Sequence, residues 1–178
     1  MKWIVRILLG LVGLLVLCVA VLFLMSKRPH AGEMHSQIEI AAPPQVVFEW
    51  VTQPDKLTRW VSWLVDVRHE NPDVHGVGER HTWIMHDPNM KQQMQMPATV
   101  TAYDPPRSIT VHVSAKGLFV GDATYTLKPT AAGTLLKSDS AWQYFDPFSQ
   151  LMEPLITPEA LKKERMDFAK LKQLVEAK

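Results

Sequence analysis

The sequence predicts an α+β fold, in which a curved antiparallel sheet of about seven strands wraps around a long C-terminal helix. Two short helices follow the first strand, and one transmembrane helix precedes the domain. Three features carry this prediction: a charge-free apolar segment near the N-terminus, short alternating segments separated by turn residues, and an amphipathic C-terminal segment. Because a curved sheet cannot bury its concave face alone, we expect the C-terminal helix to fill it.

The apolar segment Ile7–Met25, "ILLGLVGLLVLCVAVLFLM", has nearly the ~20 residues that a membrane-spanning helix requires. A cleaved signal peptide is the alternative, but its apolar core is shorter and ends in a small-x-small site, which this sequence lacks. Cys18 resembles a lipoprotein junction, yet Leu17 before it is too bulky. We therefore expect an uncleaved anchor over residues 1–26, followed by a linker over 27–34.

Charges on the two sides of the apolar segment favour one orientation. Lys2, Arg6 and the α-amino group precede it, whereas Lys27 and Arg28 follow it. The positive-inside rule therefore predicts a cytoplasmic N-terminus and a folded domain on the other side of the membrane. The single cysteine lies inside the apolar segment, so no disulfide reports the compartment of the domain.

The domain begins with a strand and two proline-started helices. Gln37–Ala41 alternates polar and apolar side chains, as a half-buried strand does. Pro43 and Pro44 suit a first helical turn, where a missing N–H costs little, and Pro54 ends this helix and starts another that reaches Trp60. Six further strands are predicted over 61–68, 78–86, 94–103, 108–115, 119–128 and 134–145. Their short connections favour antiparallel pairing between consecutive strands.

The chain ends in a predicted amphipathic helix. Thr157 and Pro158 resemble an N-cap followed by a first-turn proline, and residues 148–153 form a separate preceding turn. One apolar stripe contains Leu161, Phe168, Leu171 and Val175. Glu164 and Lys172 are expected to face water.

Composition excludes one class of partner. The net charge is +1, and the basic residues are scattered apart from Lys162, Lys163 and Arg165. A nucleic-acid-binding protein carries a basic face, so we expect no nucleic-acid partner and interpret this cluster as a solvated helix face.

Three stretches together resemble the bacterial polyketide cyclase/dehydrase-like branch of the START/SRPBCC superfamily, the helix-grip fold. They are "IEIAAPPQVVFEWVTQPDKLTRW" from Ile38, "GVGERHTWIM" from Gly76 and "AGTLLKSDSAW" from Ala132. Their order and spacing resemble that branch over Ser36–Ala177. The resemblance implies a domain over 35–178 whose sheet and last helix enclose a cavity for an apolar or amphipathic small molecule. It carries little information about chemistry, because one fold hosts many functions.

Strand alternation indicates which side chains face this interior. Large aromatic residues, methionines and small hydroxyls share the inward faces, as an apolar pocket with a few orienting groups requires. The alternative is a filled core in which these residues find ordinary partners. The predicted ligand-binding residues are Trp60 (as a lid), Trp83, Met94, Met96, Tyr125, Ser138, Trp142, Phe168 and Leu171.

Catalytic and metal-binding signals are weak. The candidate acids and bases are His81, His112, Asp122 and Tyr125, but the sequence alone does not bring any two together. The histidines are dispersed, without a His-x-His pair, so we predict no metal site and no cofactor. The methionine-rich stretch 83–96 could supply ligands for Cu(I), but Met94 and Met96 are already explained as inward strand residues.

The sequence thus predicts a membrane-anchored binding protein for a lipid, quinone or polyketide-like molecule. A tethered receptor suits such ligands because they partition into the bilayer. Two alternatives stay open: a cyclase- or dehydratase-like enzyme, and a non-catalytic interaction module of a membrane complex. In a bacterium, the predicted orientation is a single-pass inner-membrane protein with a periplasmic domain. No protein partner is indicated.

Overall fold

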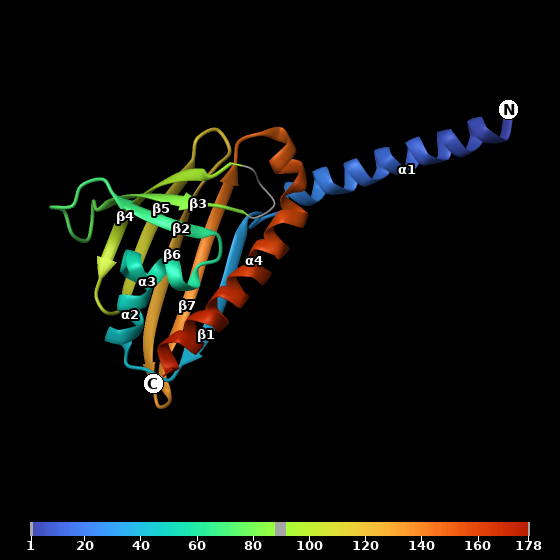
Figure 1. Ribbon diagram of the computed structural model, residues 1–178. Helices are drawn as coiled ribbons and strands as arrows, with labels where there is room; N and C mark the ends of the chain where they lie inside the picture. The colour runs from blue at the N-terminus through green and yellow to red at the C-terminus, as the bar shows by residue number, and fades with distance from the viewer. Residues whose placement is uncertain (1, 88–91, 178) are drawn as a thin grey trace.

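The computed structural model describes residues 2–87 and 92–177. Four helices and seven strands occur in these residues (Figure 1). In chain order they are α1 (Lys2–Ser26), β1 (Glu33–Ile40), α2 (Pro44–Thr52), α3 (Pro54–Trp60), β2 (Leu64–His69), β3 (Arg80–Met85), β4 (Met94–Asp104), β5 (Ser108–Ala115), β6 (Phe119–Thr130), β7 (Gly133–Tyr144) and α4 (Pro147–Glu176). This is the predicted α+β architecture.

The seven strands form one antiparallel sheet in the order β1-β7-β6-β5-β4-β3-β2. Consecutive strands from β2 to β7 pair with each other, as their short connections predicted. The exception is β1, which pairs with β7 at one edge, because α2 and α3 intervene between β1 and β2. Strand β2 is therefore the other edge, and none of the described strands pairs with its outer side.

One face of the sheet supplies the core. On β5 the side chains of Ile109, Val111 and Val113 are buried, and those of Thr110 and His112 lie on the opposite face. This alternation with a period of two residues is the pattern that the sequence shows. Helices α2, α3 and α4 all lie over the buried face, as Figure 1 shows.

The two short helices begin where the prolines predicted. Pro44 and Pro54 each occupy a first-turn position, where the absent N–H has no intrahelical partner to lose. Helix α2 buries Val47, Phe48 and Val51, and α3 buries Leu57 and Trp60.

Helix α4 differs from the prediction at its start. It begins at Pro147, capped by Asp146, whose Oδ1 accepts a hydrogen bond from the Ser149 N–H at 2.8 Å. Pro154 and Pro158 lie inside the helix instead of preceding it. Thr157 is buried, and its hydroxyl donates to Glu153 Oε1 at 2.7 Å, so it is not the N-cap. The local pattern Thr-Pro-Glu fits a helix start, but the contacts made by Glu153 keep the helix continuous.

The second half of α4 fills the concave face of the sheet. Phe168 and Leu171 are almost completely buried, and the Phe168 ring lies against Trp60 and Tyr125, with centroids 6.1 and 6.4 Å apart. Burying side chains of this size contributes about 1.5–3 kcal/mol each. Glu164, which we expected in water, instead accepts hydrogen bonds from Ser138 at 2.6 Å and Ser36 at 2.8 Å.

Helix α1 extends away from the domain, and none of its residues is buried (Figure 1). By length and composition alone, it could cross a membrane. Strand β1 already begins at Glu33, inside the range predicted as linker.

Candidate functional site

A cavity of about 60 Å³ lies between the sheet and the helices. Its walls come from α2, α3, the segment that joins α3 to β2, and strands β2 to β6. The lining residues are Val51, Thr52, Leu57, Val61, Leu64, Val67, His81, Trp83, Val100, Ile109, Val111 and Tyr125. Most of these side chains are apolar, and His81 and Tyr125 supply the principal polar groups.

The two polar lining residues have different acid–base properties. Burial, with smaller contributions from the carboxylates of Glu164 and Asp167, raises the pKa of Tyr125 well above its ordinary value. The Tyr125 hydroxyl therefore stays protonated near neutral pH and can donate a hydrogen bond. Burial, followed by repulsion from His69, lowers the pKa of His81, whereas Glu79 acts in the opposite direction. The Nδ1 atom of His81 is buried without a hydrogen-bond partner among the described residues.

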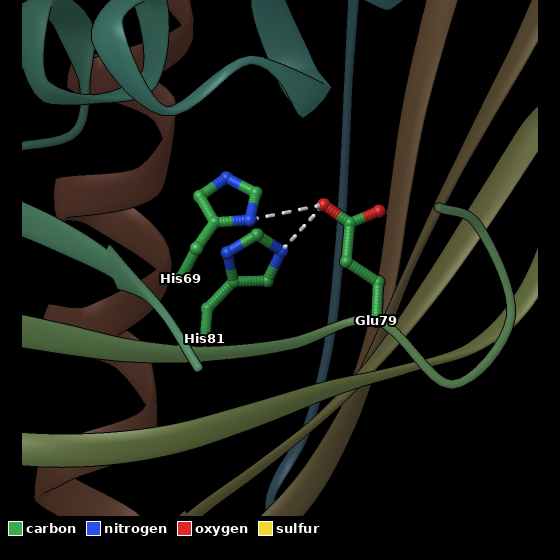
Figure 2. Close-up of side chains that lie close together, drawn as sticks. All are labelled: His69, Glu79 and His81. Carbon is green, nitrogen blue, oxygen red and sulfur yellow. Dashed lines mark ion pairs between the residues drawn. The ribbon is translucent and has the colours of Figure 1, made fainter. Parts of the chain in front are cut away.

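Three ionisable side chains meet at the β2–β3 edge of this site. The register pairs His69 of β2 directly with His81 of β3, and their rings lie 4.4 Å apart between centroids. Glu79 precedes β3, and its Oε1 lies 3.6 Å from His69 Nδ1 and 3.2 Å from His81 Nε2. Figure 2 shows one nitrogen of each ring directed at the same Glu79 oxygen.

The segment Val61–Trp63 is called the α3–β2 segment below. Its Val61 lines the cavity, and its Ser62 contacts α4. The Ser62 hydroxyl donates to Asp167 Oδ1, and Lys163 Nζ donates to the Ser62 carbonyl at 3.0 Å. Lys163 also pairs with Asp167 Oδ2 at 3.0 Å and lies 4.7 Å from the centroid of the Trp63 ring. These contacts fix the position of the α3–β2 segment, and so of Val61 in the cavity wall.

A second pocket, of about 290 Å³, lies outside the core, where the end of α1 meets β7 and α4. Lys27, Trp142, Tyr144 and Glu153 contribute to its lining. Trp142 donates from Nε1 to Ser140 Oγ at 3.1 Å and packs edge-on against Phe119, with centroids 5.6 Å apart. Trp142, which was predicted to contact the ligand, thus lines this outer pocket and not the internal cavity.

The other residues predicted to contact a ligand lie at different depths. Trp83 and Tyr125 line the internal cavity. Trp60, predicted as a lid, is only 2% exposed and donates from Nε1 to the Trp50 carbonyl at 2.8 Å. Met96, Phe168 and Leu171 belong to the buried core, Met94 is half-buried against it, and the Ser138 hydroxyl is directed to Glu164.

The candidate catalytic residues do not form one group. His81 and Tyr125 line the same cavity, but His112 lies on the outer face, where its Nδ1 is 2.9 Å from Asp122 Oδ1. Both members of this outer pair are exposed. Of the methionine-rich stretch 83–96, residues 88–91 lie outside the described residues.

The sequence analysis missed His69, Glu79, Ser62 and Asp167. For His69 the glycine-marked loop gave a partial signal, because a hairpin centred near His75 aligns it with His81. The sequence alone does not fix that register and does not bring in Glu79. No local pattern marks Asp167 as the partner of Ser62, because the two residues are distant in sequence.

The comparisons with known proteins agree with this architecture. A sequence profile of the family described as polyketide cyclase/dehydrase and lipid transport matches residues 31–176. No curated protein matches the chain. Similar solved structures include proteins from Chromobacterium violaceum (15% identity, TM-score 0.67, covering 83% of this chain and 99% of that chain) and Nitrosomonas europaea (15%, 0.66, 84% and 97%).

A protein from Mesorhizobium loti is also similar, with 21% identity and a TM-score of 0.60 over 81% of this chain and 96% of that chain. At these identities, the solved structures establish the fold and nothing about the ligand. The profile, in contrast, spans nearly all of the chain outside α1. The chain therefore belongs to the polyketide cyclase/dehydrase and lipid-transport family, within the START/SRPBCC superfamily of helix-grip domains.

Proposed function

We propose that this protein binds a hydrophobic small molecule, such as a lipid, a quinone or a polyketide-like compound, while α1 anchors it in a membrane. The observation that carries the proposal is the internal cavity, whose walls are mostly apolar and include a buried histidine nitrogen that has no partner in the part of the chain that the structure describes. Apolar walls with a few orienting polar groups are typical of small-molecule sites. Membership of a lipid-transport family supports the same class of ligand.

The cavity has to enlarge before it holds such a ligand. Its volume of about 60 Å³ has room for a few water molecules, whereas pockets for drug-sized ligands measure ~300–1,000 Å³. In this proposal the α3–β2 segment moves aside, because its Val61 lines the cavity and it adjoins the edge strand β2. Its contacts with Asp167 and Lys163 of α4 would then break. In this proposal Trp83 and Tyr125 contact the ligand, and Trp60, Met96 and Phe168 line the enlarged site.

The anchor places the domain beside the source of such ligands. Helix α1 is exposed along its whole length and apolar enough to span a bilayer. With more positive charge before the apolar segment than after it, the domain lies outside the cytoplasm, which in a bacterium is the periplasmic side of the inner membrane. A ligand dissolved in the membrane then reaches the cavity over a short distance.

The test is to identify what co-purifies with the full-length protein in detergent. We expect mass spectrometry of organic extracts to find a lipid-soluble molecule enriched over a control membrane protein purified in the same way. Val111→Phe inserts a larger side chain into the cavity wall and should remove most of this molecule. Val65→Phe is the matched control, because Val65 is exposed on β2.

Two results would contradict the proposal: no enriched molecule in the wild-type protein, or equal amounts in the two variants. Circular dichroism checks that Val111→Phe is folded. If Val111→Phe is not folded, a second experiment replaces the comparison of variants: quenching of tryptophan fluorescence by a brominated fatty acid. Quenching should then weaken in Trp83→Phe, since Trp83 lines the cavity, and equal quenching would count against the site.

An enzyme of the cyclase or dehydratase type is the second candidate function. The observation that favours it is the presence of His81 and Tyr125 in one cavity. A protonated tyrosine can act as a general acid and a neutral histidine as a general base. Turnover of the co-purified molecule that is lost in Tyr125→Phe, with binding retained, would establish it.

A further inference from the structure

The side chains of His69, Glu79 and His81 converge although they are separated in sequence. Strands β2 and β3 place the two histidines opposite each other, and the turn before β3 brings in the glutamate. Among the residues that the structure describes, this is the group whose ligand atoms lie close enough to hold a metal ion, all within 4.8 Å of one another. Figure 2 shows these three side chains lying close together.

We propose that His69 Nδ1, His81 Nε2 and Glu79 Oε1 bind a Zn²⁺ ion at the edge of the internal cavity. Zinc bonds to imidazole nitrogen and carboxylate oxygen are ~2.0–2.2 Å long, which in a tetrahedron separates neighbouring ligand atoms by about 3.3–3.6 Å. The two distances to Glu79 Oε1, 3.6 and 3.2 Å, are close to this range.

The donor set favours zinc over the hard cations. Ca²⁺ and Mg²⁺ prefer six or more oxygen ligands, whereas two imidazoles and one carboxylate suit Zn²⁺. Three protein ligands leave the fourth position of the ion to water or to a group of a bound molecule.

The surroundings of the three side chains support the site. The Gly76 N–H donates to Glu79 Oε2 at 3.0 Å, which orients the carboxylate and leaves Oε1 directed at the histidines. When Nε2 of His81 binds a metal, its proton resides on Nδ1, the buried atom that has no protein partner among the described residues. Because His81 lines the cavity, that N–H is available to an acceptor inside it. The exposed His69 gives an ion a path from solvent.

The experiment uses full-length protein in detergent, with any polyhistidine tag removed and bound metal stripped by a chelator. Isothermal titration with ZnCl₂ should show saturable binding that is weakened at least about tenfold in His69→Gln and Glu79→Gln. His69 is a suitable first variant because its exposure makes loss of the fold a small risk. Titration with MgCl₂ should show no binding.

Two other histidines serve as matched controls. His112 pairs with Asp122 on the outer face, and His35 pairs with Asp139 at the surface. His112→Gln and His35→Gln should bind Zn²⁺ as the wild type does. In the Co²⁺-loaded protein, the visible spectrum of a tetrahedral ion should be present and should disappear in His69→Gln.

The proposal is overturned if the wild type shows no saturable zinc binding, or if His69→Gln binds as tightly as the wild type. It is also overturned if the control variants lose the ion as readily as His69→Gln does. These outcomes do not depend on a hydrophobic ligand, since Zn²⁺ alone is the probe. Failure of ligand binding and failure of metal binding are therefore distinguishable.

Discussion

Gly32 illustrates how a single residue joins three parts of the molecule. Its φ of +80° is one that glycine adopts without strain, and an added Cβ would lie 2.2 Å from the Trp142 carbonyl oxygen. Its N–H donates to Glu153 Oε1 at 2.9 Å, and its carbonyl accepts from the Trp142 N–H at 3.1 Å. A side chain at this position would therefore separate the chain after α1 from both β7 and α4.

His35 makes a pH-dependent contribution to the stability of the fold. Its Nδ1 lies 2.6 Å from Asp139 Oδ1 on the neighbouring strand β7. The hydrogen bond to Asp139 raises the pKa of His35, and Glu33 adds to the effect. Because the folded-state pKa exceeds that of the unfolded chain, this pair stabilises the fold at low pH. The contribution is lost as the pH rises through the folded-state pKa.

The prediction is that Asp139→Asn returns the pKa of His35 towards that of a free histidine. NMR titration of the histidine side chains, with His35→Gln to assign the signal, measures this change. The free energy of unfolding of Asp139→Asn should also vary less with pH than that of the wild type. An unchanged His35 pKa in Asp139→Asn would show that the carboxylate is not the cause.

At the scale of elements, α4 shows how tertiary contacts override a local signal. Two prolines remove hydrogen-bond donors from the helix at positions 154 and 158, which normally ends or bends a helix. Here the intervening turn is held by the buried Glu153, which accepts from Thr157, Gly32 and Arg28. The helix thus runs from the end of α1 to the far end of the sheet.

The α3–β2 segment should become more mobile when its fastening is removed. Ser62→Ala deletes the hydroxyl that donates to the buried carboxylate of Asp167. A hydrogen bond to a charged group is worth about 1.5–3 kcal/mol, so the free energy of unfolding should fall by about that amount. Hydrogen exchange in the segment should become faster, and a co-purified ligand should dissociate more quickly.

Thr58→Ala is the control for this prediction. Its hydroxyl donates to the Asp55 carbonyl at 3.1 Å on the exposed side of α3, away from α4. It should leave exchange in the α3–β2 segment unchanged. Equal exchange rates in Ser62→Ala and the wild type would show that this contact does not restrain the α3–β2 segment.

At the scale of the whole molecule, the chain after α1 is fixed to the domain. Arg28 donates from its two terminal nitrogens to the Glu153 carboxylate at 2.7 and 3.1 Å. Glu153 is 3% exposed, so these donors take the place of water around its carboxylate. The predicted linker is therefore a structured connection, and the direction of α1 is coupled to the position of α4.

Removing Arg28 should weaken this connection. Arg28→Ala leaves Glu153 with the Gly32 N–H and the Thr157 hydroxyl as donors, and we expect the free energy of unfolding to fall by about 1.5–3 kcal/mol. Chemical unfolding in detergent measures this loss, and limited proteolysis should cut residues 27–32 faster. Lys27→Ala is the control, because the Lys27 side chain lies over the Phe23 ring of α1. Equal effects of the two substitutions would contradict the coupling.

Much of the fold was predictable because it follows from local periodicity. Alternation in Ser108–Ala115 and the prolines at 44 and 54 decide strand faces and helix starts within a few residues. The resemblance supplied the arrangement of these elements. Candidate site residues such as Trp83 and Tyr125 could be assigned to an inward face, but their neighbours could not be named.

The sequence by itself determined the order of the elements, the faces of the strands and the apolar character of α1, since each depends on residues close together in the chain. Only the tertiary structure decided which charged groups meet: His69 with Glu79 and His81, Ser62 with Asp167, and Arg28 with Glu153. The tertiary structure also decided that the cavity is small, at about 60 Å³. These outcomes depend on strand register and on the packing of helices against the sheet, which no local pattern encodes.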